Sequence, residues 1–156
     1  MGGKTFKNVG ALCPVTMKML KHLPDVMLSG FSFFEPGAIL RPHVGPDRSA
    51  LICHLAIKIP GQCGIVVAGV KKEWVEGKCL IFDDTLLHSA WNQSKDLRAI
   101  LFVSFRRPGF KKIPKDVLEK WDIFGKQLAV NAIQFCKNEA PKYSKFAQEC
   151  FSPHTK

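Results

Sequence analysis

Short apolar runs separated by turn residues fill the middle of the chain, from about Met27 to Phe105. Pairs such as Pro36-Gly37 and Pro60-Gly61 lie between these runs, a pattern typical of antiparallel barrels and sandwiches. The strands that we expect span residues 30–35, 39–41, 51–59, 64–67, 71–74, 79–82, 88–92 and 99–105. Their number and brevity predict an all-β fold, a closed double-sheet jelly roll.

The two ends of the chain have a helical pattern instead. Residues 16–23 predict a short N-terminal helix, and apolar residues between Pro114 and Asn138 recur at roughly helical spacing. This second helix is expected to pack on its own domain, with a membrane-surface or partner-binding role as the alternative. We expect one domain over residues 1–156, with a β core at about 27–110 and a C-terminal helical segment at about 114–150.

Composition is consistent with one soluble domain of 156 residues, of which 46% are hydrophobic. The net charge of +10 invites a nucleic-acid or anionic partner, but the basic residues are scattered in short pairs such as Lys71-Lys72. We therefore expect a solvated surface and no nucleic acid, with a basic nucleic-acid-binding barrel as a rival interpretation. The six cysteines have no zinc-type spacing and are expected to be reduced and buried.

Nothing in the sequence indicates a membrane span or a leader peptide. No run approaches the roughly 20 apolar residues that a spanning helix needs, and the N-terminus lacks an apolar run with a cleavage site. These patterns predict no transmembrane segment and slightly favour a cytoplasmic location.

Three histidines and an arginine lie on the expected strands or at their ends: His43, His54, His88 and Arg98. Mononuclear non-heme iron is commonly held by two histidines and one carboxylate. The carboxylate usually lies two residues after the first histidine, and here that position is Gly45. Either two histidines alone hold the metal, with water or an anion in the third position, or His43 is not a ligand.

The order and spacing of these residues resemble the aspartyl/asparaginyl β-hydroxylase family. The matching motifs lie between about Phe31 and Pro108: His-x-Gly-Pro from residue 43, a histidine at 54, Phe-Asp-Asp-Thr-x-x-His-x-x-Trp-Asn from residue 82, and an arginine at 98. The resemblance implies a double-stranded β-helix fold of the cupin-like type, an Fe(II) centre and 2-oxoglutarate as cosubstrate.

Position by position, the resemblance assigns the iron to His43 and His88. The family too lacks the usual carboxylate, so Gly45 conforms to its pattern. Asp84 matches the acidic position of the family and would hold an iron-bound water or orient the ligands. Asp83 is interpreted as a turn residue.

The resemblance also implies that three further residues bind the cosubstrate. Arg98 would pair with the distal carboxylate of 2-oxoglutarate, Ser32 would share it, and His54 would meet the proximal carboxylate. One departure is Ile52, because family members commonly place an arginine there; Lys58 and Arg41 are candidates to compensate. Two tryptophans at family positions, Trp74 and Trp91, are interpreted as residues of the barrel wall.

The implied activity is that of a 2-oxoglutarate-dependent dioxygenase that hydroxylates a C–H bond. A protein or peptide partner is expected, hydroxylated at the β-carbon of Asp or Asn residues. The alternatives are a lipid A acyl-chain hydroxylase of the same family, a non-catalytic jelly-roll binding module and an iron halogenase.

Overall fold

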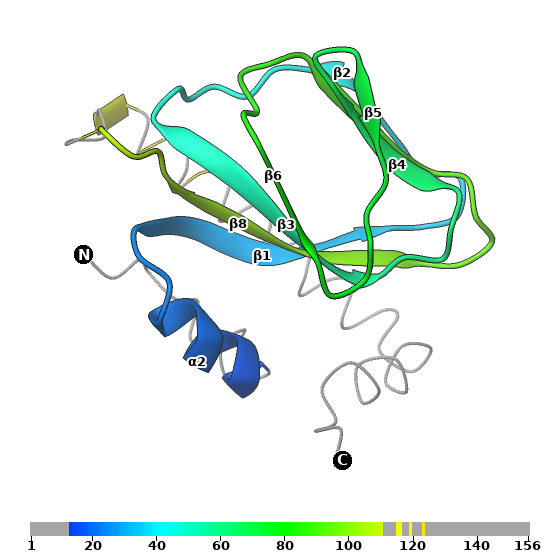
Figure 1. The fold of residues 1–156 in the computed structure, drawn as a ribbon, viewed down its shortest axis with the longest axis horizontal. Coiled ribbons are helices and arrows are strands. Elements are labelled where there is room, and N and C mark those ends of the chain that lie inside the picture. Colours follow the sequence, from blue (N-terminus) through cyan, green and yellow to red (C-terminus); the bar gives the residue numbers. More distant parts are fainter. Residues whose placement is uncertain (1–12, 111–114, 117–118, 120–122, 124–156) are drawn as a thin grey trace.

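The structure is a computed structural model that describes residues 13–110, 115–116, 119 and 123 (Figure 1). The elements of its described part are α2 (Pro14–Lys21), β1 (Val26–Phe34), β2 (Ile39–His43), β3 (Ala50–Lys58), β4 (Cys63–Val67), β5 (Val70–Lys72), β6 (Cys79–Phe82), β7 (His88–Asn92) and β8 (Arg98–Arg106). The helical segment expected at about 114–150 lies almost wholly outside the described residues.

The strands form two four-stranded sheets that face each other. Their orders are β1-β8-β3-β6 and β2-β7-β4-β5, and all pairings are antiparallel. The chain crosses from one sheet to the other at every connection except the β4–β5 hairpin. This alternation is the topology of a double-stranded β-helix, so the predicted jelly-roll fold is confirmed.

The N-terminal helix begins and ends two residues earlier than the sequence pattern predicts. Pro14 occupies its first turn, where a missing N–H costs nothing. The basic side chains Lys18 and Lys21 lie in the last turn, where they complement the helix dipole. Pro24 restricts the residue before it to non-helical conformations, which ends the helix ahead of Leu23.

Only β6 and β7 have the predicted bounds, and the other six strands differ by one to four residues at an end. β1 begins at Val26, four residues before the expected start, because its pairing with β8 extends to Phe105. The strand expected at 71–74 is β5, Val70–Lys72. A two-residue turn, in which Ala68 and Gly69 have positive φ, leads directly into this strand, so the strand begins at Val70.

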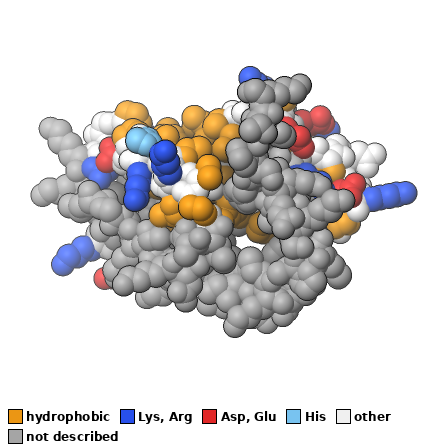
Figure 2. Space-filling view, turned by 90° about the horizontal axis from the view of Figure 1, so that it is seen from below, with side chains coloured by type: hydrophobic (Ala, Val, Ile, Leu, Met, Phe, Trp, Pro, Cys, Tyr) orange, Lys and Arg blue, Asp and Glu red, His pale blue; other side chains and the backbone are white. Residues whose placement is uncertain are grey.

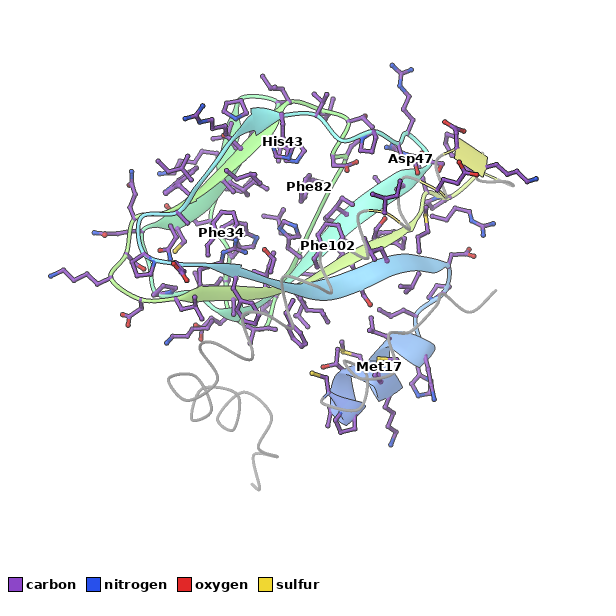
Figure 3. The ribbon with its side chains drawn as sticks, turned by 180° about the vertical axis from the view of Figure 1, so that it is seen from behind. Met17, Phe34, His43, Asp47, Phe82 and Phe102 are labelled. Atoms are coloured by element: carbon purple, nitrogen blue, oxygen red, sulfur yellow. The ribbon has the colours of Figure 1, made fainter. Side chains whose placement is uncertain are left out.

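The interior lies between the two sheets. One cluster of buried residues joins the sheets, and partly buried Phe34 and Phe82 pack against it; its members are Ala56, Cys63, Ile65, Trp74 and Ala90. A smaller cluster surrounds Ala50 and Ile52 near one end of β3. Figure 3 shows Phe82 and Phe102 in the space between the sheets.

The cysteines only partly follow the expectation. The four described cysteines, Cys13, Cys53, Cys63 and Cys79, are all free, as predicted. Cys63 is buried, but Cys79 is exposed and Cys13 and Cys53 are partly exposed, so the prediction of burial is wrong for these three. Cys53 on β3 and Cys79 on β6 are next to inward-facing His54 and Leu80, so their thiols face away from the interior.

The face seen from below in Figure 2 carries lysine and arginine side chains that lie apart from one another among hydrophobic ones. Within the described ranges, no helix is both long enough and apolar enough to cross a membrane.

Candidate functional site

Two histidines meet at one end of the jelly roll. His43 ends β2 and His88 begins β7, and the two residues are direct partners in the antiparallel ladder. Their ring centroids are 4.1 Å apart. His88 is buried, whereas His43 is exposed. A pair of imidazoles is therefore presented at the boundary between interior and solvent.

Each histidine is oriented by the backbone of its own strand end. The Nδ1 atom of His43 lies 2.8 Å from the carbonyl oxygen of Arg41, and that of His88 lies 2.8 Å from the carbonyl oxygen of Leu86. A carbonyl can only accept, so Nδ1 carries the proton in both rings and Nε2 keeps its lone pair. Burial lowers the pKa of His88, which favours the neutral ring that metals require.

A carboxylate fills the place that a side chain at position 45 would need. A Cβ built on Gly45 would lie 2.0 Å from Oδ2 and 2.3 Å from Cγ of Asp84. The Gly45 N–H also donates to the Asp84 carbonyl at 2.6 Å. Only glycine permits this approach, so the missing side chain of the His-x-Gly motif is replaced in space by Asp84, from the β6–β7 connection.

Asp84 is buried, and its Oδ1 has no hydrogen-bond partner. Burial, with the nearby charges of Asp83 and Asp47, raises its pKa to about 6. Asp83 instead caps a turn through Thr85 and forms an ion pair with Arg107. The interpretation of Asp83 as a turn residue is consistent with these contacts.

A second group of polar residues lies deeper, on the other sheet. Arg98 is only 1% exposed, and its Nε and Nη1 have no hydrogen-bond partner. Its guanidinium lies 3.9 Å from the ring centroid of Phe34 and 4.9 Å from that of Trp74. Desolvation lowers its pKa to about 10, so it remains charged at neutral pH. Burying a guanidinium without an anionic partner costs on the order of several kcal/mol of folding free energy, unless a ligand supplies the anion.

His54 lies in the same interior, on β3. Its Nδ1 is buried without a partner, and its ring packs between Phe82 and Phe102, with centroids 5.0 and 5.8 Å away. Burial, followed by the charges of Arg98 and His88, lowers its pKa to about 3. His54 is thus neutral at working pH and can donate or accept one hydrogen bond.

Ser32 shares the inner face of this sheet with Arg98. Ser32 pairs with Ile100, and Phe34 pairs with Arg98, two residues along the same ladder. Because alternate residues share a face of a strand, the hydroxyl and the guanidinium lie on the same side. Of the six residues selected from the sequence, three come from the β1-β8-β3-β6 sheet, two from the other sheet and one from the connection between them.

The departure at Ile52 leaves an apolar region beside His54. Ile52 is 1% exposed and packs with Leu28, Phe82 and Phe102. It pairs with Ser104, whose buried hydroxyl has no partner. Arg41 is exposed on the other sheet, and Lys58 lies at the far end of β3, so neither is positioned beside Ile52 to replace an arginine.

Trp74 and Phe34 belong to the site, although the sequence did not single them out for it. Trp74 is buried as expected, but its ring contacts both Arg98 and His54. A signal existed for Trp74, because its position matches the family; Phe34 was indistinguishable from a core residue. Trp91, in contrast, lies under Lys71 on the outer side.

The residues fit iron and a dicarboxylate 2-oxo acid. The centroids of the two imidazole rings lie 4.1 Å apart, the Asp84 carboxylate lies against Gly45 close by, and imidazole nitrogen is a good donor to iron. Within the described residues no group of three His, Cys, Asp or Glu side chains could hold a metal ion, so the protein would supply two ligands and leave the other positions to small molecules. The unpaired atoms of Arg98 and His54 fit an anion with two acceptor ends.

Fold and site together define a double-stranded β-helix protein with a two-histidine centre. The profile of the family described as "Aspartyl/Asparaginyl beta-hydroxylase" matches residues 1–108. The chain belongs to this family.

Curated relatives agree with this assignment. The chain is 39% identical over 110 residues to "Ornithine lipid ester-linked acyl 2-hydroxylase" of Rhizobium tropici, which covers 69% of this chain and 39% of the relative. It is 32% identical over 126 residues to "Aspartate beta-hydroxylase domain-containing protein 2" of Xenopus tropicalis, covering 75% of this chain and 34% of the relative. The chain therefore spans between a third and two fifths of the length of these relatives.

Among solved structures, the chain is similar to the "Schizosaccharomyces pombe Cnp3 Cupin Domain", with a TM-score of 0.45 and 13% identity. That likeness covers 54% of this chain and 58% of the other.

Proposed function

We propose that this protein is an Fe(II)- and 2-oxoglutarate-dependent oxygenase that hydroxylates a C–H bond of its substrate. The observation that supports this most strongly is the buried guanidinium of Arg98, without an anionic partner, in the interior that His43 and His88 border. A structural arginine at this depth would have a carboxylate partner. A ligand that brings a carboxylate to Arg98 and a chelating end to the histidines accounts for both groups.

Iron with 2-oxoglutarate and dioxygen, when bound, would supply the oxidation: one oxygen atom of O2 enters the C–H bond as the alcohol, the other enters succinate, and the 2-oxo acid loses CO2. The protein residues do the positioning. His43 and His88 would present Nε2 to the metal, held by their Nδ1 hydrogen bonds. Arg98 and Ser32 would bind one carboxylate of the cosubstrate, and His54, as a neutral ring, would donate to the other.

Asp84 would act on water beside the metal. Its Oδ1 has no partner, so it can accept a hydrogen bond from a water molecule held between it and the histidine pair. Trp74, Phe34 and Phe82 would exclude bulk water from the cosubstrate, because they enclose Arg98 and His54.

Two substrate classes remain proposals. The first is the β-carbon of Asp or Asn residues in a protein, as the family name suggests. The second is the acyl chain of a lipid. Ile52 favours the second, because the described residues packed around it, Leu28, Phe82 and Phe102 among them, are apolar and offer no cation for a substrate carboxylate.

The test is turnover of 2-oxoglutarate by the full chain, measured as succinate formed with and without Fe(II). We expect iron-dependent succinate even without a substrate, and more of it with a true substrate. Mass spectrometry of Asp-containing peptides and of lipids would then identify the hydroxylated product. No succinate in iron-loaded protein, with 2-oxoglutarate still bound, would support the non-catalytic binding module instead; a halogenated product formed in chloride would support the halogenase.

A further inference from the structure

Four aliphatic side chains are exposed around the two histidines. Val44 follows His43, Leu86 and Leu87 precede His88, and Val70 follows the β4–β5 turn. Between 46% and 59% of each is exposed to solvent. We call these four residues the apolar rim.

The apolar rim is one surface, although it comes from three separate connections. The Gly45 N–H donates to the Asp84 carbonyl, which joins the β2–β3 connection to the β6–β7 connection. The Ala68 N–H donates to the Leu87 carbonyl, which joins the β4–β5 turn to the same segment. These connections lie together at the top of Figure 1.

The charge around the apolar rim is positive. Of the carboxylates in the connections next to it, Asp47 and Asp84 are buried, and Asp83 forms an ion pair with Arg107. The cationic side chains of this end are instead exposed: Arg41, Arg48 and Lys72. Each of these cations lies within four residues of Val44 or Val70 in the sequence. An aliphatic surface with exposed cations near it has the chemistry that binds the boundary of an anionic lipid bilayer.

We propose that the apolar rim docks on an anionic lipid surface. This docking does not depend on the proposed function. Val44, Leu86, Leu87 and Val70 enter the acyl boundary while the cations contact lipid headgroups. The histidine pair then lies at the membrane boundary.

A peptide substrate would need different features at this entrance. An extended peptide binds through main-chain hydrogen bonds and pockets for polar side chains, whereas four exposed aliphatic groups offer none of these. The exposed charge suits an acidic peptide, but the apolar rim does not.

The experiment is sedimentation with vesicles of phosphatidylcholine, with or without phosphatidylglycerol, using the full chain without added iron. We expect binding to the anionic vesicles that weakens with salt, and little binding to neutral ones. Leu87→Glu with Val70→Glu should reduce binding at least tenfold, roughly the loss of two aliphatic anchors.

The matched control is Ile39→Glu with Val75→Glu. Both residues are exposed aliphatics, 69% and 63%; Ile39 begins β2 and Val75 lies in the β5–β6 connection. The charge change is the same. This pair should lose less than about threefold in binding, from the change in net charge alone. Neither pair should change succinate formation without substrate, since none of the four side chains is placed in the site.

Equal losses in both pairs, or no binding to anionic vesicles, would overturn the docking proposal. Hydroxylation of an Asp-containing peptide without vesicle binding would overturn it in favour of a protein substrate, while leaving the oxygenase chemistry intact. Vesicle binding that depends on the apolar rim, in a protein that forms no succinate, would support the docking surface and contradict the proposed oxygenase instead.

Discussion

The two sheets of the jelly roll contribute different chemistry to one interior. The β2-β7-β4-β5 sheet supplies His43 and His88 at its open end, where His43 is exposed to solvent and His88 is buried. The β1-β8-β3-β6 sheet supplies Arg98 and His54 at depth, among aromatic rings. One sheet therefore presents lone pairs for a metal, and the other presents donors for an anion.

This difference suggests how the two halves are stabilised. The histidines satisfy their Nδ1 atoms within their own strand ends, so that sheet is complete without a ligand. Arg98 and His54 keep buried nitrogen atoms without partners, so the other sheet is complete only when an anion binds. Substitutions in the two sheets should therefore have opposite effects on the free protein.

The largest effect is expected from Arg98→Met. Removing a buried charge that lacks a partner should stabilise the free protein by about 1–3 kcal/mol. The same change should weaken 2-oxoglutarate binding about 100-fold or more, because a buried carboxylate would then lack its cation. Thermal unfolding with and without 2-oxoglutarate measures both.

Arg106→Met, on the same strand, is the control for that variant. Arg106 pairs with Asp25 at 3.5 Å near the surface, and such pairs contribute at most about 1 kcal/mol. If Arg98→Met destabilised the free protein while 2-oxoglutarate still raised its melting temperature, the two-sheet comparison would be wrong.

A smaller effect is expected at the junction of the sheets, from Gly45→Ala. The new Cβ would collide with the Asp84 carboxyl group, and overpacking of this kind costs about 1–3 kcal/mol. Urea unfolding should show that the double variant Gly45→Ala with Asp84→Ala recovers part of the loss. Gly30→Ala is the control, because nothing lies within 4 Å of the Cβ it would add, and it should show no comparable loss of stability. If Gly45→Ala also showed no loss, the placement of Asp84 against Gly45 would be wrong.

The next effect depends on pH and comes from Asp84→Asn in metal-free protein. A carboxyl whose pKa rises on folding from 3.8 to about 6 destabilises the folded state wherever it is ionised. That destabilisation is absent below the unfolded pKa, grows through the window up to about pH 6 and is complete above it. Asp84→Asn should therefore stabilise the protein at pH 8, by on the order of 2 kcal/mol, and not at pH 4. Melting curves at both pH values measure this difference. Stabilisation at pH 4 alone would contradict the prediction.

The smallest effect is expected from Ser104→Ala, which sharpens the comparison within one sheet. Its hydroxyl is buried without a partner, as Arg98 is, but it lies beside Ile52 in an apolar cluster. Its removal should be neutral or stabilising by up to about 1 kcal/mol, with no change in 2-oxoglutarate binding. A clear loss of cosubstrate affinity in a calorimetric titration would mean that the cosubstrate reaches Ser104.

Much of this arrangement was predictable because local patterns dictate it. Short apolar runs and Pro-Gly turns located all eight strands, and the resemblance of the motifs selected His43, His88 and Arg98. Strand ends were less accurate, since the start of β1 depends on its pairing with β8 rather than on its own residues.

Contacts between distant segments could not be predicted in the same way. The sequence explains neither why Gly45 needs to be glycine nor what encloses Arg98. Both answers come from side chains of other connections and strands, Asp84 in the first case and Phe34 with Trp74 in the second. The exposure of Cys79 also follows from which face of β6 points inward, which its apolar neighbours in sequence concealed.

The most direct test of the central claim is an anaerobic titration of the metal-free protein with Fe(II) and 2-oxoglutarate, following the visible charge-transfer band of a chelated 2-oxo acid. We predict a band in the wild type that His43→Ala and His88→Ala both lose, and that Arg98→Met forms only at far higher 2-oxoglutarate concentration. No band in the iron-loaded wild type, or a band that survives loss of either histidine, would contradict the assignment of this end of the jelly roll as the iron and cosubstrate site.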